Sequence, residues 1–180
     1  GGDRRVRGAV FVVDSLDADL ATVQSLREAI RRFRERGKEA ICWLSSMGTA
    51  EVYLAAACDR VLVPESASLF APGLRVEQVF LKETLALAGI EAQLEAFSEY
   101  KVAPDTFCRA AMSEPHREML NAILDSAFAE VVRGVAEGRE LSPEQVRALM
   151  DRMPLSAQEG VEAGLIDGLC YAVSYTHLTL

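Results

Sequence analysis

The fold is decided by the stretch Gly8-Ala-Val-Phe-Val-Val-Asp14, a continuous apolar run near the start of the 180-residue chain. A second run of the same kind follows at Glu39-Ala-Ile-Cys-Trp-Leu44. Strands that are buried on both faces of a parallel sheet have this uninterrupted apolar character. We therefore predict that both stretches are strands of one parallel sheet.

The residues between the two runs have the spacing of an amphipathic helix. Asp17 or Asp19 can cap its amino terminus, and Gly37 can end it. Its apolar face consists of Leu20, Val23, Leu26, Ile30 and Phe33. A strand, a helix and a strand in this order imply parallel pairing through a right-handed crossover, so the predicted fold class is α/β, a mostly parallel sheet flanked by helices.

The alternation continues along the rest of the chain. Two further strands are predicted, over residues 60–64 and 67–71, and the run 92–96 is predicted as a third. Helices are predicted over 50–58, 76–87, 113–138 and 143–150. Ser113 and Ser142 mark the starts of the last two, and the stretch Leu155-Ser-Ala-Gln-Glu-Gly160 opens a further short helix. The stretch Gly164-Leu-Ile-Asp-Gly168 then closes the fold.

Composition limits the classes of function. Half of the residues are hydrophobic and 26% are charged, as in ordinary globular domains. A net charge of −8 argues against a nucleic-acid partner. The arginines at 31, 32, 34 and 36 alternate with Glu28 and Glu35, which is typical of a solvated helix face. The sequence contains no apolar run of 18 residues that could span a bilayer.

We predict one domain over residues 1–171. The chain begins Gly1-Gly2-Asp3 without an initiator methionine, so we expect a piece of a longer protein. Residues 172–180, with His177, resemble translated cloning sequence and are expected to be a non-native tail. The four cysteines are widely spaced and form no C-x-x-C pair, which favours buried free thiols. We therefore expect neither a metal nor a cofactor.

The candidate for chemistry is Lys101, in the stretch Phe97-Ser-Glu-Tyr-Lys-Val-Ala-Pro104. It should follow a buried strand at a point where Pro104 prevents a smooth helix. A lysine placed there can turn its amine against apolar walls, and desolvation lowers the pKa of such an amine toward that of a general base. The competing interpretation is an ordinary solvated lysine in a loop.

Other catalytic constellations find little support in the residues. Outside the tail, His116 is the remaining histidine, and the chain has no G-x-S-x-G elbow for it to serve, so we expect it on a helix surface. No phosphate-binding glycine loop is present. What remains is a hydroxyl from Ser45, Ser46 or Thr49 at a strand-to-helix turn, with Lys101 as its base.

The order of four motifs resembles the signal peptide peptidase A (protease IV) family. The motifs are Tyr53-Leu-Ala-Ala-Ala-Cys-Asp-Arg60, Tyr100-Lys-Val-Ala103, Met112-Ser-Glu-Pro115 and Ala163-Gly-Leu-Ile-Asp-Gly168. The resemblance covers about residues 3 to 171. It implies the ClpP/crotonase-like fold and a serine endopeptidase with a Ser–Lys dyad, anchored in the bacterial inner membrane at its periplasmic face, that degrades cleaved signal peptides. A cytoplasmic location is the alternative.

The chain departs from that family at the nucleophile. Active members begin the Ala-rich helix with Ser-Gly-Gly-Tyr, and by register the serine position falls on Thr49, followed by Ala50 and Glu51. The family also has a glycine-rich turn after its first strand, where backbone amides stabilise the oxyanion. The matching stretch here is Asp14-Ser-Leu-Asp-Ala-Asp19, which has no glycine and carries additional carboxylates.

The chain has the family's lysine, at Lys101, but not its serine. In this it resembles the amino-terminal domain of the long, two-domain members of the family. The resemblance then implies that Lys101 is the general base, that a second peptidase domain carries the serine, and that the protein is a homo-oligomer. The substrate peptide would bind as an added strand in an apolar groove. Two alternatives stay open, a non-catalytic crotonase-like scaffold and a self-contained dyad that uses Thr49.

Overall fold

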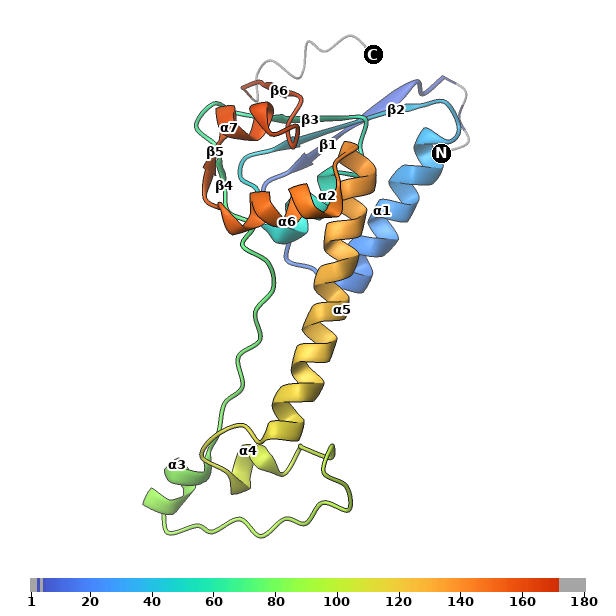
Figure 1. Ribbon diagram of the computed structural model, residues 1–180. Coiled ribbons are helices and arrows are strands. Elements are labelled where there is room, and N and C mark those ends of the chain that lie inside the picture. Colours follow the sequence, from blue (N-terminus) through green and yellow to red (C-terminus); the bar gives the residue numbers. More distant parts are fainter. Residues whose placement is uncertain (1–2, 4, 172–180) are drawn as a thin grey trace. The chain divides into compact units, whose positions relative to one another are not determined.

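The computed structural model describes residue 3 and residues 5–171. Its main sheet is entirely parallel and consists of β1 (Gly8–Val13), β2 (Glu39–Leu44), β3 (Arg60–Val63) and β6 (Gly168–Leu169), in the order β1-β2-β3-β6 (Figure 1). β1 and β2 pair along their whole length, from Gly8 opposite Glu39 to Val13 opposite Leu44. The predicted α/β class with a parallel sheet is confirmed.

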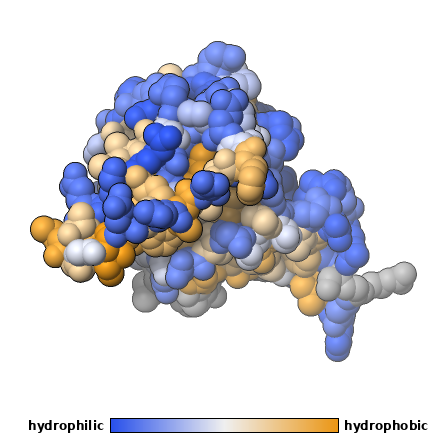
Figure 2. All heavy atoms as spheres, turned by 90° about the horizontal axis from the view of Figure 1, so that it is seen from below, coloured by the Kyte–Doolittle hydropathy of each residue, from blue (hydrophilic) through white to orange (hydrophobic). Residues whose placement is uncertain are grey.

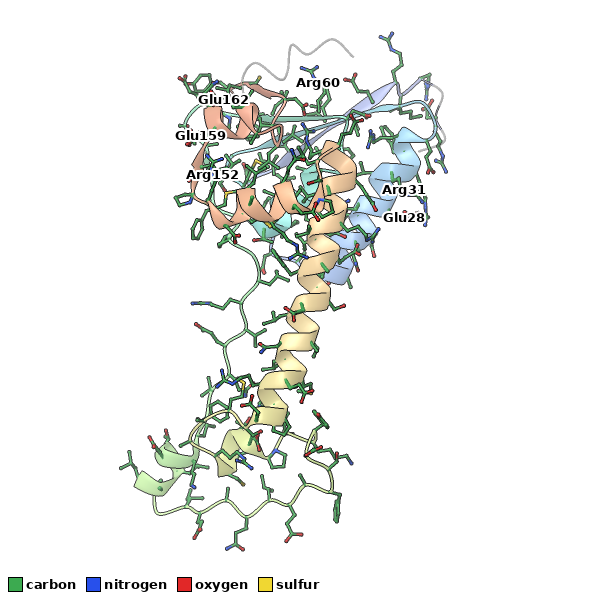
Figure 3. All side chains as sticks on the ribbon, viewed as in Figure 1. Glu28, Arg31, Arg60, Arg152, Glu159 and Glu162 are labelled. Atoms are coloured by element: carbon green, nitrogen blue, oxygen red, sulfur yellow. The ribbon has the colours of Figure 1, made fainter. Side chains whose placement is uncertain are left out.

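The crossover between β1 and β2 is helix α1 (Leu20–Arg34). Asp19 caps it, because its carboxylate accepts a hydrogen bond of 2.7 Å from the backbone N–H of Thr22. Of the predicted apolar face, Val23 and Ile30 are buried, whereas Leu26 is 42% exposed. The opposite face carries the arginines, and Figure 3 shows Glu28 and Arg31 together on it, with Nε of Arg31 2.8 Å from Glu28.

β1 is an edge strand of the main sheet, since its pairing within the described residues is with β2. An apolar groove of about 950 Å³ lies along it, lined by Val10 and Val12 of β1 and by Leu26 and Phe33 of α1. The strand is therefore less covered than its apolar sequence predicts, and Val12 is 47% exposed.

Helix α2 (Thr49–Ala55) packs closely against a much later part of the chain. A Cβ added to Gly138 would lie 2.7 Å from the carbonyl carbon of Ala56, so only glycine fits where these backbones meet. Asp59, just after α2, accepts hydrogen bonds from the backbone N–H of Ala40 (2.8 Å) and from Arg34 Nε (2.7 Å). The Ala-rich motif is thus a packing element that joins α1, β2 and β3.

The predicted serine start signals are confirmed in two of the carboxy-terminal helices. Ser142 and Gln145 form a capping box at the start of α6 (Pro143–Asp151). Ser156 and Glu159 form another at the start of α7 (Ala157–Glu162). The long helix α5 (Glu114–Arg139) precedes them. The strand predicted over 67–71 is reduced to β4 (Ser68–Leu69), which pairs antiparallel with β5 (Leu155–Ser156) outside the main sheet.

An ion pair fixes the closing motif at the end of the sheet. The Asp167 carboxylate accepts two hydrogen bonds from Arg139, of 2.9 and 2.8 Å, and one of 2.6 Å from the backbone N–H of Val61. Burial raises the pKa of Asp167, but the hydrogen bonds from Arg139 and Val61 outweigh that effect and leave the pKa below its usual value. This contact places β6 beside β3.

The described residues fall into two compact units: the first contains those within 1–73 and 129–180, and the second consists of residues 74–128. The first contains the sheets; the second contains α3 (Lys82–Leu87), α4 (Asp105–Cys108) and the beginning of α5. The boundary predicted at residue 171 stays a prediction, because the tail 172–180 lies outside the described residues. Among the described helices, none is both long and apolar enough to cross a bilayer.

Two predicted elements of the second unit are wrong or shortened. The strand over 92–96 is absent, since these residues have no regular structure and Leu94 is 52% exposed. Residues 74–128 form no strand at all, so an alternating apolar run there has no partner to pair with. The helix predicted from Val76 begins only at Lys82, because the backbone N–H of Leu81 donates to Thr106 (2.7 Å) instead of forming a helical turn.

Candidate active site

The turn between β2 and α2 holds the candidate hydroxyl groups, and two of them donate to backbone carbonyls. Oγ of Ser45 donates to the carbonyl of Asp14 (3.1 Å), and Oγ1 of Thr49 donates to the carbonyl of Gly73 (2.8 Å). Ser46 is exposed. The Thr49 hydroxyl proton is therefore used in a structural contact, which is the ordinary role of a hydroxyl at a helix start.

Glu51 reaches from α2 to the turn that follows β1. Its Oε1 accepts a hydrogen bond of 2.9 Å from the backbone N–H of Leu16. Leu16 lies in the Asp14–Asp19 stretch, which corresponds by register to the glycine-rich oxyanion turn of the resemblance. The same side chain covers Gly48, since a Cβ there would lie 2.7 Å from Oε2 of Glu51.

This contact changes what the turn can do chemically. A carboxylate already occupies the Leu16 amide, and a negative charge there opposes a second one on a developing oxyanion. An oxyanion site needs donors that are free to meet the charge as it forms. The geometry therefore agrees with the departures in sequence, because it places a carboxylate at the turn where the family pattern has glycines.

Lys101 lies in the second unit, in an irregular segment before α4. Lys101 is exposed, so the expectation that apolar walls cover its amine is wrong for the described residues. The physical reason is the missing strand over 92–96, which was expected to carry Lys101 into the interior. Thr49 belongs to the other unit. The catalytic roles of Lys101 and Thr49 stay predictions.

His116 is not on a helix surface, as its sequence context had suggested. It is 4% exposed, and its Nδ1 is buried without a hydrogen-bond partner. Nδ1 lies 3.6 Å from Oδ2 of Asp105, and the ring of Phe80 meets the imidazole edge-on at 6.2 Å. Sequence reasoning missed Asp105 altogether. The sequence did contain a signal for Asp105, an acidic residue directly after Pro104 at the start of a short helix. Many helices start in this way, so the pattern alone does not identify a functional residue.

The thiols and the possible metal ligands offer no further site. Cys42 and Cys58 are buried, as predicted, and both Cys108 and Cys170 are partly exposed. The hydrogen bond with Cys58 and burial both raise the pKa of Cys42, so its thiol stays protonated. Within residues 5–171, no three His, Cys, Asp or Glu side chains are arranged to hold a metal ion.

The described fold, a parallel sheet of strand–helix–strand units with an Ala-rich helix after its second strand, is ClpP/crotonase-like. The solved structure of the 1510-N membrane-bound stomatin-specific protease superposes with a TM-score of 0.56 at 10% sequence identity, over 94% of this chain and 67% of that one. At this identity the likeness shows the fold alone.

Peptidase family S49 matches residues 32–174, and the chain belongs to that family. A serine protease, the chloroplastic SPPA of Arabidopsis thaliana, is 31% identical over 169 residues, which cover 94% of this chain and 25% of the relative. Protease 4 of Haemophilus influenzae is 24% identical over 145 residues, 80% of this chain and 24% of the relative. The resemblance to the signal peptide peptidase A family is thus confirmed. The chain spans about a quarter of the length of these two curated relatives.

Proposed function

We propose that this chain is the lysine-contributing domain of a serine endopeptidase that resembles signal peptide peptidase A. The observation that carries the proposal is the hydrogen bond from the Leu16 amide to Glu51. It occupies the turn where an active domain of this family would stabilise the oxyanion. The Thr49 hydroxyl, at the position of the family nucleophile, donates its proton to the Gly73 carbonyl. Lys101, at the position of the family's general base, is exposed and can reach a partner domain.

In this proposal, the neutral amine of Lys101 removes the proton from a serine hydroxyl on a second peptidase domain and later protonates the leaving amine. The exposure of Lys101 supports a shared site, because an amine that works with another domain has to be accessible to it. The second domain would then supply the apolar surroundings that the exposed amine of Lys101 lacks among the described residues.

The finer points are proposals by resemblance. The substrates would be cleaved signal peptides bound in an extended form, the protein would be a homo-oligomer, and the enzyme would face the periplasm from the bacterial inner membrane. A catalytic site completed between neighbouring domains would explain why the matched relatives are several times longer than the matched region.

The test is substitution of Lys101 in the full-length protein. A general base contributes about 100- to 10,000-fold to the rate, so Lys101→Ala should lower kcat by at least about 100-fold while the circular dichroism spectrum is unchanged. Lys82→Ala is the matched control, since Lys82 is also exposed and lies in the same unit. Full activity of Lys101→Ala would refute the role.

A non-catalytic scaffold is the second candidate, and the exposure of Lys101 is also what a solvated loop lysine would show. The two functions differ in one measurement. A scaffold would leave kcat of the full-length enzyme unchanged in Lys101→Ala, whereas a shared catalytic site would not.

A further inference from the structure

The segment that carries Lys101 is tied to α5 on both sides of the lysine, within one unit. On its amino-terminal side, the phenol of Tyr100 donates to Oε2 of Glu118 at 2.9 Å. On its carboxy-terminal side, Oδ2 of Asp105 accepts a hydrogen bond of 2.6 Å from Oγ of Ser113. Both partners lie at or next to the first turns of α5.

The backbone between these ties is itself folded into tight turns. The N–H of Lys101 donates to the carbonyl of Ser98 (3.0 Å), and the N–H of Asp105 donates to the carbonyl of Val102 (2.9 Å). Lys101 therefore sits on a short turn between two side-chain anchors. Because the turn is anchored, the Lys101 side chain can point in fewer directions. The anchors themselves do not contact the amine.

Asp105 is the more constrained of the two anchors. Its side chain is 13% exposed, and it also accepts a 3.1 Å hydrogen bond from Nε of Arg109. The hydrogen bond from Ser113 lowers the pKa of Asp105 against the effect of burial, and Arg109 adds to that lowering. The carboxylate thus stays charged at neutral pH. Its Oδ1 accepts the hydrogen bond from Arg109 at the end of α4, and its Oδ2 connects α4 to Ser113 at the start of α5.

His116 completes the packing around this carboxylate. Its buried Nδ1 has no hydrogen-bond partner and faces Oδ2 of Asp105 at 3.6 Å. Buried polar atoms without a hydrogen-bond partner are uncommon. The imidazole packs beside the carboxylate, whose side chain is 13% exposed.

We infer that Asp105 is a positioning residue for Lys101. Its hydrogen bond with Ser113 attaches the turn that contains Lys101 to the start of α5. The inference rests on the proposed function, since it assumes that the direction of the Lys101 amine matters for catalysis. Catalytic groups lose about 100-fold in rate when they are misplaced by about 1 Å, so the fixed turn would act on kcat rather than on substrate binding.

The test uses Asp105→Ala, Ser113→Ala and Asp105→Asn in the full-length enzyme. We expect Asp105→Ala and Ser113→Ala to lower kcat about 10- to 100-fold with KM unchanged. Asp105→Asn keeps an oxygen that can accept the hydrogen bond from Ser113, so it should recover part of the loss. Glu114→Gln is the control, because Glu114 is an exposed carboxylate on the same helix and should leave kcat unchanged.

A second measurement on residues 1–180 themselves does not depend on activity. Amide hydrogen exchange over residues 98–105 should become at least about tenfold faster in Asp105→Ala and in Ser113→Ala, while the amides of β2 and β3 stay protected. Faster exchange with an unchanged kcat would overturn the positioning role, and so would unchanged exchange. A full-length Lys101→Ala variant that keeps its activity would instead refute the proposed function.

Discussion

Oε1 of Glu51 accepts a hydrogen bond of 2.9 Å from the backbone N–H of Leu16, although the two residues are 35 positions apart in the sequence. The contact joins the first turn of α2 to the turn after β1. Two departures from the family pattern, the carboxylate at position 51 and the glycine-free turn at 14–19, are therefore one structural feature. The carboxylate satisfies one amide of this turn and places a negative charge beside it.

The first prediction concerns this contact. Glu51→Ala removes a charge-assisted hydrogen bond and should lower the free energy of unfolding by about 1 to 2 kcal/mol. Glu51→Gln keeps an acceptor oxygen and should lose less. Urea denaturation of residues 1–180 measures both changes. An alanine variant as stable as the parent would show that the contact contributes nothing.

The second prediction separates the shared site from a self-contained one. A fluorophosphonate probe, which labels activated hydroxyl nucleophiles, should not label Thr49 in residues 1–180. That hydroxyl donates to the Gly73 carbonyl, and the Glu51 carboxylate at the turn after β1 opposes a developing oxyanion. The full-length protein should be labelled at a serine outside these residues. Mass spectrometry that located the label on Thr49 would establish the self-contained dyad instead.

The third prediction concerns the crossing of α5 with the end of α2. Gly138→Ala places a methyl group against the backbone carbonyl of Ala56, whose carbon would lie 2.7 Å from the new Cβ. Because the clashing atoms belong to the backbone of another element, they cannot move aside as a flexible side chain could. We expect a loss of about 3 kcal/mol or more in the free energy of unfolding. Glu137→Ala, one residue earlier and exposed, should cost less than about 1 kcal/mol. Similar midpoints of thermal unfolding for the two variants would contradict the close packing.

The fourth prediction is the pH dependence of the Asp167–Arg139 pair. The pKa of Asp167 is lower in the folded protein than its ordinary value, so its contribution to stability is complete above that ordinary value, about 4. The contribution is lost as the pH falls through the folded pKa. Asp167→Asn should cost about 2 kcal/mol at pH 7 and clearly less at pH 3, by urea denaturation at both values. An equal cost at the two pH values would exclude the linkage.

The sequence by itself determined the central part of the fold. Uninterrupted apolar runs identified β1 and β2, and Asp19, Ser142 and Ser156 marked helix starts that the structure reproduces. These signals are local, since a cap or an apolar run depends on a few neighbouring residues. The family resemblance was also readable, because it rests on the order of short motifs.

The second unit was decided only by tertiary structure. The alternating residues 92–96 had the pattern of a strand, but a strand forms only beside another strand, and residues 74–128 provide none. His116 had the local context of a helix surface, yet Phe80 and Asp105 bury it.

The candidate site shows the same division. The sequence alone was enough to align Lys101, Thr49 and Glu51 with the family motifs. The hydrogen bonds from Leu16 to Glu51 and from Ser113 to Asp105 form only in the folded chain. Each of these contacts joins groups on different elements, and their distance in space is set by packing rather than by spacing in the chain.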